Sequence, residues 1–471
     1  MTLPAGDAPA PPRGGGAILI ENIERFWRRT EKYVRSKLVW NSLYRVTSYL
    51  RSSLWIVPFL AILLVLAVVP IIRWIDARLA WRLFGLTVAG AQSLYESVIT
   101  LTLSFLVFTF GSLLVAIQVA SGQLTPRIIA TTLLRDKVVK YTVGLFVFTL
   151  VFAVMALNRV ETGGHDIVAI VIAMLGIGSI ASFLFLIDYA ARLLRPVSIL
   201  AHVGDAGLAV IKAVYPLTTG AAADATGEVP GSGDGPHRVV AHESSSASVL
   251  AVDLGTLVRE AERTDGIIEF VPRVGDFVAA GEPLFILHGN ARAIDDARLH
   301  ATVAFGRERT MEQDPLFSFR IMVDIALKAL SPAINDPTTA VLALDQIHRL
   351  LRAVGRRQLR GQTIHDAWGR ERVIYRTPNW EDFVHLACHE IRMCGANSVQ
   401  VARRLRAMFD NLLLTLPPHR RPALEQESRL LTLTIELLYR FPEDLALARV
   451  PDAQGLGGSS GQTVPTPPEL R

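Results

Sequence analysis

The stretch SSLWIVPFLAILLVLAVVPII, residues 52–72, lies between Arg51 and Arg73 and contains no charged residue. A helix rises about 1.5 Å per residue, so these 21 residues are long enough to cross the hydrocarbon core of a bilayer. Pro58 lies near the start of the stretch and Pro70 near its end, where a helix tolerates proline best. The stretch therefore predicts a membrane-spanning helix.

Three more uncharged runs follow, at residues 97–126, 141–158 and 167–187. The whole chain of 471 residues is 51% hydrophobic, with a mean hydropathy of +0.35, which is high for a soluble protein. The first run begins too far along the chain to be a cleavable signal peptide. We predict an α-helical membrane protein with about four transmembrane helices and a soluble α+β region after them.

Lysine and arginine in the loops predict the orientation, because cytoplasmic loops carry an excess of both. Fourteen of these residues fall on one side of the predicted spans: Arg25, Arg28, Arg29, Lys32, Arg35, Lys37, Arg45, Arg51, Arg127, Arg135, Lys137, Lys140, Arg192 and Arg195. Only four fall on the other: Arg73, Arg78, Arg82 and Arg159. We expect a multi-pass protein of the bacterial plasma (inner) membrane, with both termini in the cytoplasm.

Small and polar residues follow one face of the second span. The residues Ser97, Thr100, Ser104, Gly111, Gln118 and Gly122 recur on it at helical spacing. A glutamine side chain is costly in lipid, so we expect this face to meet protein or water, and the face with Leu106 and Leu113 to meet lipid or the other spans. Close packing between helices is one interpretation, and the lining of a pore in a homo-oligomer is the other. No Asp, Glu, Lys, Arg or His lies within a span, which disfavours a proton-coupled transporter.

The segments around the spans divide the chain further. Residues 18–50 resemble an amphipathic helix, with Ile23, Trp27, Val34 and Leu38 at helical spacing. This helix could lie among lipid headgroups or pack on the soluble region. The expected units are a disordered and amphipathic N-terminus (1–50), a transmembrane domain (51–192), a connector and linker (193–237), a small β-rich module (238–290), a helical domain (291–450) and a disordered tail (451–471).

The β-rich module carries the pattern V-G-D-x-V-x-x-G-x-P-L at residues 274–284, which resembles half of a biotinyl or lipoyl carrier domain. Such carriers modify a lysine, but no lysine lies between Lys212 and Lys328. We therefore expect a small β-barrel-like module with no cofactor. In the helical domain, Asp314-Pro315 and Asp336-Pro337 predict helix starts, and further helices are expected at 380–394, 398–415 and 420–440.

Few residues in the soluble region suggest chemistry. Arg307 and Arg309 could contact an anion, although a solvated, salt-bridged helix entry is the favoured explanation. Arg320 and Asp324 are spaced to pair on one helix face. His385 and His389 have the spacing of a metal pair, but no third ligand is evident, so we expect no metal.

Other residues have simpler explanations. The arginines at 349, 352, 356, 357 and 360 crowd a helix end, where cations are favourable, and contact with anionic lipid is the alternative. Cys388 and Cys394 are expected to be reduced and mostly buried. No signature of catalysis is visible, so we expect no enzyme, and we expect no nucleic-acid partner.

Four segments together resemble a family of bacterial membrane proteins, domain of unknown function 2254. They are SSLWIVPFL at residues 52–60, VAIQVASGQLTPRIIATTLLRD at 115–136, VGDFVAAGEPL at 274–284 and RERTMEQDPLFSFRIMVDIALKALSPAINDPTTAV at 307–341. The resemblance spans about residues 45–440 and implies location in a membrane, but no activity. Our leading hypothesis is a homo-oligomeric, channel-like protein whose cytoplasmic domain senses or gates. The alternative is a membrane-anchored signalling or scaffold protein without a pore.

Overall fold

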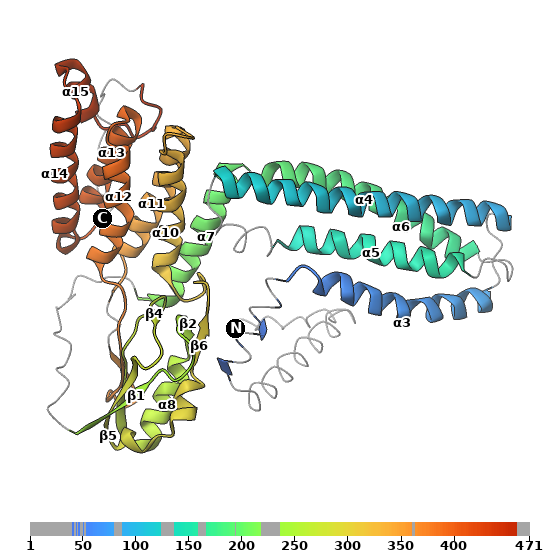
Figure 1. The fold of residues 1–471 in the computed structure, drawn as a ribbon, viewed down its shortest axis with the longest axis horizontal. Coiled ribbons are helices and arrows are strands. Elements are labelled where there is room, and N and C mark those ends of the chain that lie inside the picture. The colour runs from blue at the N-terminus through green and yellow to red at the C-terminus, as the bar shows by residue number, and fades with distance from the viewer. Residues whose placement is uncertain are drawn as a thin grey trace, which may run out of the picture.

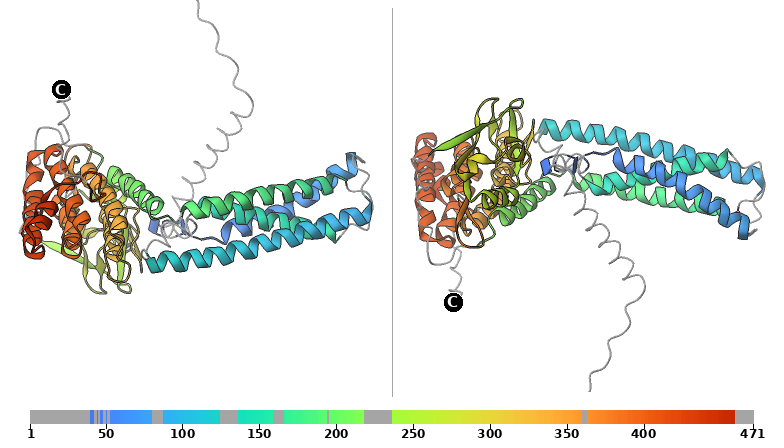
Figure 2. Two further views of the ribbon diagram at one scale, coloured as in Figure 1. Left: turned by 90° about the horizontal axis from the view of Figure 1, so that it is seen from above. Right: turned by 90° about the horizontal axis from the view of Figure 1, so that it is seen from below.

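A computed structural model describes residues 40–41, 44, 46–47, 50, 53–79, 87–123, 136–158, 166–193, 195–217, 236–359 and 363–458. An elongated helical bundle projects from one side of a soluble region, which contains a β-rich module and a helical domain (Figure 1). The views from above and below show the same separation (Figure 2).

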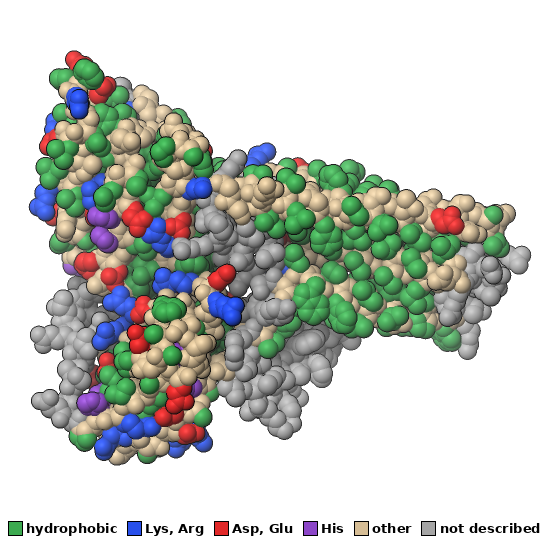
Figure 3. Space-filling view, in the orientation of Figure 1, with side chains coloured by type: hydrophobic (Ala, Val, Ile, Leu, Met, Phe, Trp, Pro, Cys, Tyr) green, Lys and Arg blue, Asp and Glu red, His purple; other side chains and the backbone are tan. Residues whose placement is uncertain are grey.

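The bundle consists of α3 (Ile56–Leu79), α4 (Val88–Gln123), α5 (Lys137–Leu157) and α6 (Asp166–Leu193). The helices run up-down-up-down, so α3 begins and α6 ends at the end of the bundle that carries the soluble region (Figure 1). Val65, Tyr95, Phe152 and Ile172, one from each helix, meet in a buried cluster. On the face seen in Figure 3, hydrophobic side chains are spread over much of the bundle surface, as expected of a surface in contact with lipid.

Four described helices are long and apolar enough to cross a membrane: α4, α5, α6 and α7 (Pro196–Val214), whereas the apolar part of α3, Ile56–Ile72, is shorter. Packing distinguishes α7 from α3. Helix α7 buries Ile199, Val203 and Ile211 in the core of the helical domain, whereas α3 packs against α5 in the bundle. We therefore assign α3 to the membrane bundle and α7 to the soluble region. Pro70 lies inside α3 rather than near its end, because the helix continues past the predicted span.

The β-rich module contains two open sheets, so the expectation of a β-barrel-like module is wrong. The larger sheet has the order β1-β5-β3-β8-β7 and the smaller one β4-β2-β6. The strands are β1 (His237–Ala241), β2 (Ala247–Val252), β3 (Gly266–Phe270), β4 (Phe277–Val278), β5 (Pro283–Gly289), β6 (Val303–Gly306), β7 (Thr363–His365) and β8 (Glu371–Tyr375). Strand β8 pairs parallel with β3, although it follows it by about a hundred residues. Helices α8 (Leu254–Thr264) and α9 (Asp296–His300) complete the module.

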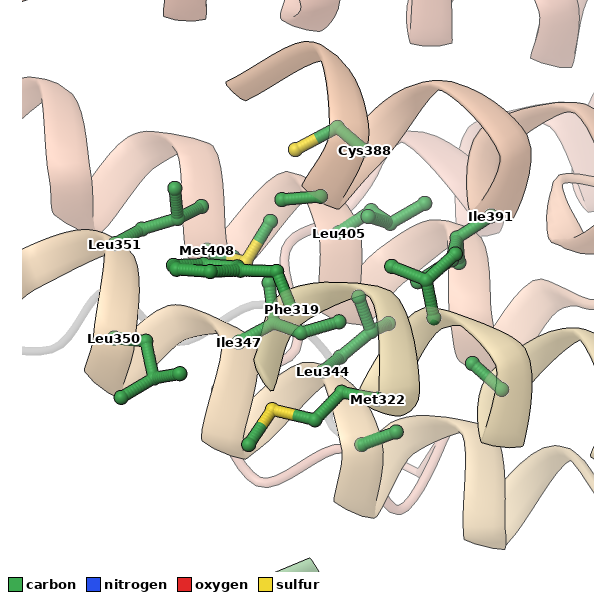
Figure 4. Packing of buried hydrophobic residues seen from close by; sticks show 14 of the residues in the cluster. Phe319, Met322, Leu344, Ile347, Leu350, Leu351, Cys388, Ile391, Leu405 and Met408 are labelled. Atoms are coloured by element: carbon green, nitrogen blue, oxygen red, sulfur yellow. The ribbon is translucent and has the colours of Figure 1, made fainter. Parts of the chain in front are cut away.

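The helical domain surrounds one apolar core that α7 completes. It contains α10 (Pro315–Ala329), α11 (Pro337–Gly355), α12 (Trp380–Gly395), α13 (Val399–Thr415), α14 (Arg421–Leu438) and α15 (Pro442–Arg449). Phe319 and Met322 of α10 meet Leu344 and Ile347 of α11 within this core (Figure 4). Asp314 and Asp336 cap α10 and α11 and are each followed by proline, which confirms both predicted helix starts.

Two segments expected to be irregular or bound to lipid contact the soluble region where they are described. Asn41 donates from its backbone to the carbonyl of Ala301 over 3.3 Å, and Trp40 and Tyr44 pack beside β2 and β6. The rest of the amphipathic segment, with Ile23, Trp27, Val34 and Leu38, lies outside the described residues. At the other end, fully buried Arg403 donates to the carbonyls of Val450 and Gly457, which holds residues 451–458 against α13.

Candidate functional site

A polar cleft of about 770 Å³ opens in the soluble region between the first turn of α10, one face of α12 and the start of α14. Its charged and imidazole side chains are Arg273, Arg309, Arg320, Glu381, Asp382, His385, His389, Glu390 and Glu427. Figure 3 shows histidine, arginine and acidic side chains gathered on this part of the surface, close to the β-rich module. No Ser, Thr or Cys is among the described residues that line it.

One wall of the cleft joins the β-rich module to α12. Asn379 and Asp382 form a reciprocal capping box at the start of α12. Asp382 also accepts a hydrogen bond of 2.9 Å from the guanidinium of Arg273, which precedes β4. The carboxylate of Asp382 thus serves the helix cap and the contact between domains.

Beside this wall, the turn at Gly275 packs closely against Arg309 and Asp314. Gly275 has φ +96°, a conformation that L side chains rarely adopt, and a Cβ there would lie 2.3 Å from atoms of both Arg309 and Asp314. Nε of Arg309 lies 3.3 Å from Oδ2 of Asp314, but this oxygen has no aligned hydrogen-bond donor among the described residues. Burial raises the pKa of Asp314 to about 6, and the charge of Arg309 opposes that rise only in part.

The floor of the cleft holds an ion-pair network on α10 and α12. Arg320 contacts Asp324 on its own helix and donates two hydrogen bonds, of 2.7 and 3.0 Å, to the carboxylate of Glu390. The hydrogen bond from Arg320 is the main cause that lowers the pKa of Glu390. The predicted pair of Arg320 and Asp324 forms, and the fold adds Glu390 to it.

Histidines and a buried acid lie at the opposite wall. His385 and His389 lie one turn apart on α12, with ring centroids 4.6 Å apart. Glu427 of α14 is buried, and their potential ligand atoms all lie within 4.8 Å of one another. Arg392 donates to Glu427 over 3.1 Å and to Nδ1 of His389 over 3.2 Å. Two imidazoles and a carboxylate therefore converge at the mouth of the cleft.

The structure separates several residues that the sequence groups. Arg309 lines the cleft, whereas Arg307 is exposed and is not among the described residues that line it. Arg349 pairs with Asp205 of α7, and Arg357 donates to the carbonyls of Tyr215 and Pro216, so these arginines bind the end of α7. Of the cysteines, Cys388 is buried as expected, but Cys394 is exposed, because it lies on the outer face of α12.

Glu427 is the residue that sequence reasoning missed. It lies on α14 in the buried series Leu424, Glu427, Leu431 and Ile435, at positions that otherwise hold core residues. An acid in an apolar series is a signal in the sequence, since buried carboxylates require a partner. That its neighbours would be histidines of α12 could not be read from this spacing.

A second candidate surface is the stripe on α4. Ser97, Thr100, Ser104, Gly111, Gln118 and Gly122 are all exposed on the single chain. The opposite face of α4, which includes Tyr95, Val98 and Leu106, is buried against the rest of the bundle. Within the described chain, a Cβ at Gly111 or Gly122 would meet nothing within 4 Å. The stripe therefore does not serve packing inside one chain.

Comparison with known proteins identifies relatives of this chain. Residues 51–411 match the family described as "Predicted membrane protein (DUF2254)". Uncharacterized proteins of Mycobacterium bovis and Mycobacterium tuberculosis are each 24% identical over 421 residues, which cover 85% of this chain and 80% of theirs. No solved structure matches the chain.

Proposed function

The chain belongs to the family of predicted membrane proteins called domain of unknown function 2254. We propose that it is a homo-oligomeric, channel-like protein of the bacterial inner membrane. In this proposal the helical bundle crosses the membrane, the stripe of α4 faces other copies or a central aqueous path, and the soluble region lies in the cytoplasm as a sensing or gating domain. The role is not enzymatic.

The observation that carries the proposal is the exposure of the stripe on the outside of its own bundle. The hydroxyls of Ser97 and Ser104 donate to carbonyls one turn earlier, over 2.7 and 2.8 Å, which makes them tolerable in lipid. Gln118 makes no hydrogen bond to the described part of the chain, and an amide without a partner costs a few kcal/mol in hydrocarbon. A second copy or water would relieve that cost.

Flanking residues support the same arrangement. Leu103, Val107 and Leu114 on one side of the stripe, and Phe108 on the other, are large and between 50% and 67% exposed. Lipid covers such side chains without cost, whereas small residues leave room for the close approach of another helix. The stripe is thus the part of α4 best suited to contact with another α4.

A direct connection joins the bundle to the soluble region. Helix α6 ends at Leu193, and α7 begins at Pro196. Close approach fixes α7 to the helical domain: a Cβ at Gly204 would lie 2.4 Å from Gln346, and one at Gly207 would lie 2.6 Å from Ser318. A shift of α10 or α11 would therefore move the start of α7 and the end of α6, as a gating domain requires.

The alternative function is a membrane-anchored signalling or scaffold protein without a pore. It uses the same soluble region, and its α4 stripe is closed by tight packing between copies. The two functions differ in whether water reaches the middle of the stripe.

Cysteine labelling distinguishes these functions. In a chain with Cys388→Ala and Cys394→Ser, single cysteines replace Ser104 or Gly111, and Leu114→Cys is the matched control on the flank expected to face lipid. In native membranes we expect a water-soluble thiol reagent to label positions 104 and 111 but not 114. Protection of all three in an intact oligomer would favour the scaffold. Quenching at position 111 by a lipid-soluble probe would contradict both functions.

A further inference from the structure

We infer that the mouth of the cleft is a binding site for a divalent transition metal, with His385, His389 and Glu427 as its ligands. The three residues come from two helices, α12 and α14, whose packing brings them together. This inference does not depend on the proposed channel, because it concerns only the soluble region.

The spacing of the ligands supports the inference. Histidines four residues apart on a helix project from the same face and can bind one ion together. Zinc lies about 2.0–2.2 Å from nitrogen and oxygen ligands, so the ligand atoms must lie roughly 3.5 Å apart. They now lie within 4.8 Å of one another, and His385 is exposed, so rotation of its ring can close the difference.

The surroundings of Glu427 prepare it as a ligand. Its side chain is 7% exposed, and Nε of Arg392 donates to Oε2, which leaves Oε1 available. Arg392 is held in turn by the hydroxyl of Thr434 over 3.2 Å. An outer partner of this kind orients a ligating carboxylate. The side chain of the buried acid is thus already fixed in direction by Arg392.

Metal binding would also change the hydrogen bonds of Arg392. Its second guanidinium nitrogen donates to Nδ1 of His389, so this imidazole carries its proton on Nε2. Coordination through Nε2 requires the proton to move to Nδ1, which can then no longer accept from Arg392. Binding of a metal would therefore break the hydrogen bond between Arg392 and His389, which both lie on α12. The hydrogen bond from Arg392 to Glu427 of α14 would remain.

Charge and chemistry indicate the class of ion. Four acidic side chains and three arginines line the cleft, and a fourth arginine, Arg392, contacts Glu427 and His389. Acidic and basic groups therefore balance in number, and the arginines do not exclude a cation. Two imidazoles with one carboxylate suit Zn²⁺ and its neighbours, whereas Mg²⁺ and Ca²⁺ prefer oxygen ligands alone. Three protein ligands leave the fourth position of a tetrahedral ion open to water or another ligand, unlike the closed four-ligand sites of structural zinc.

Metal binding to the full chain tests the inference. Untagged protein is purified in detergent, stripped with a chelator and titrated with Zn²⁺, and Co²⁺ is used to read the coordination geometry by absorption. We expect about one Zn²⁺ per chain and the visible bands of four-coordinate Co²⁺. His385→Ala and His389→Ala should each weaken Zn²⁺ binding by at least about 10-fold, since even loss of an outer partner costs that much.

The matched control is His365→Ala, which removes an exposed histidine on β7 away from the cleft and should bind as the wild type does. Glu427→Gln tests the third ligand, and because it also disturbs buried Arg392, its circular dichroism is compared first. His385 is exposed, so its variant should fold in any case. If the wild type binds no stoichiometric Zn²⁺, or if His385→Ala binds it as tightly as His365→Ala, the inference is wrong.

Discussion

Asp314 is a single residue that serves three parts of the fold. One of its carboxylate oxygens caps α10 by accepting from the backbone of Phe317 over 3.2 Å. The other lies beside Arg309 and against the turn at Gly275, where no side chain would fit. Two segments quoted in the family resemblance, at 274–284 and 307–341, therefore meet at this carboxylate. Gly275, Arg309 and Asp314 are explained by this one contact between the β-rich module and the helical domain.

The stability of the protein should depend on pH through Asp314. Its pKa is raised from 3.8 to about 6, so between these values the folded chain keeps a proton that the unfolded chain has lost. The contribution of Asp314 to the free energy of unfolding is then fully present below about pH 4. It is lost as pH rises through 6, by roughly 3 kcal/mol in total. Asp314→Asn keeps a capping side chain and should abolish this part of the pH dependence.

Thermal unfolding of the full chain in detergent, between pH 4.5 and 7.5, measures the effect. Asp336→Asn at the cap of α11 is the control, and it should follow the wild type. An Asp314→Asn curve parallel to that of the wild type would show that the carboxylate does not carry the pH dependence.

At the scale of the element, α4 uses its two faces differently. One face packs inside the bundle, where a Cβ on Gly176 of α6 would lie 3.0 Å from Val98. The other presents the stripe to the outside. In α5, Gly144 is needed for close packing, because a Cβ there would lie 2.7 Å from Val57 of α3. Glycine thus has a packing role within the chain at 144 and none at 111.

This contrast predicts different effects for two similar substitutions. Gly144→Leu should destabilise the bundle itself, by about 1–3 kcal/mol or more, because overpacking forces helices apart. Gly111→Leu should leave the folded chain unchanged and weaken its assembly, since its side chain would point away from the bundle. Thermal unfolding and light scattering of the purified proteins separate the two effects. Unchanged assembly in Gly111→Leu would argue that the stripe is not an interface.

At the scale of the whole molecule, the up-down-up-down bundle carries its soluble region at one end (Figure 1). The start of α3, the end of α4, the start of α5 and the end of α6 all lie at this end (Figure 1). The fourteen lysines and arginines counted above come before α3, between α4 and α5, in the first turn of α5, and at or just after the end of α6. The positive-inside rule then predicts that the soluble region is cytoplasmic.

Reporter fusions test this orientation. A reporter after Arg471 that works only in the cytoplasm should be active, and one that works only in the periplasm should be silent. The same pair placed between Glu161 and Gly163, in the loop between α5 and α6, should give the reverse result and is the internal control. Periplasmic activity after Arg471 would refute the orientation.

The sequence by itself determined the membrane bundle, the polar stripe and the helix starts of the soluble region. These features are local: an uncharged run long enough to cross lipid, a helical period, or an aspartate followed by proline each acts through neighbours in the chain. The predicted helices at 380–394, 398–415 and 420–440 accordingly match α12, α13 and α14 to within a few residues.

Only the tertiary structure decided which distant segments meet. Strand β8 joins β3 across about a hundred residues. The motif that suggested half a barrel divides between β4 of the smaller sheet and the start of β5 in the larger one, and both sheets are open. Glu427 joins His385 and His389 because α14 packs on α12, and spacing along the chain carries no information about that contact. The apolar face of α7 suits lipid or protein equally, and burial of Val203 and Ile211 on the helical domain is what selects protein. Hydrophobic burial has no direction of its own, so the partner of an apolar face is set by the whole fold.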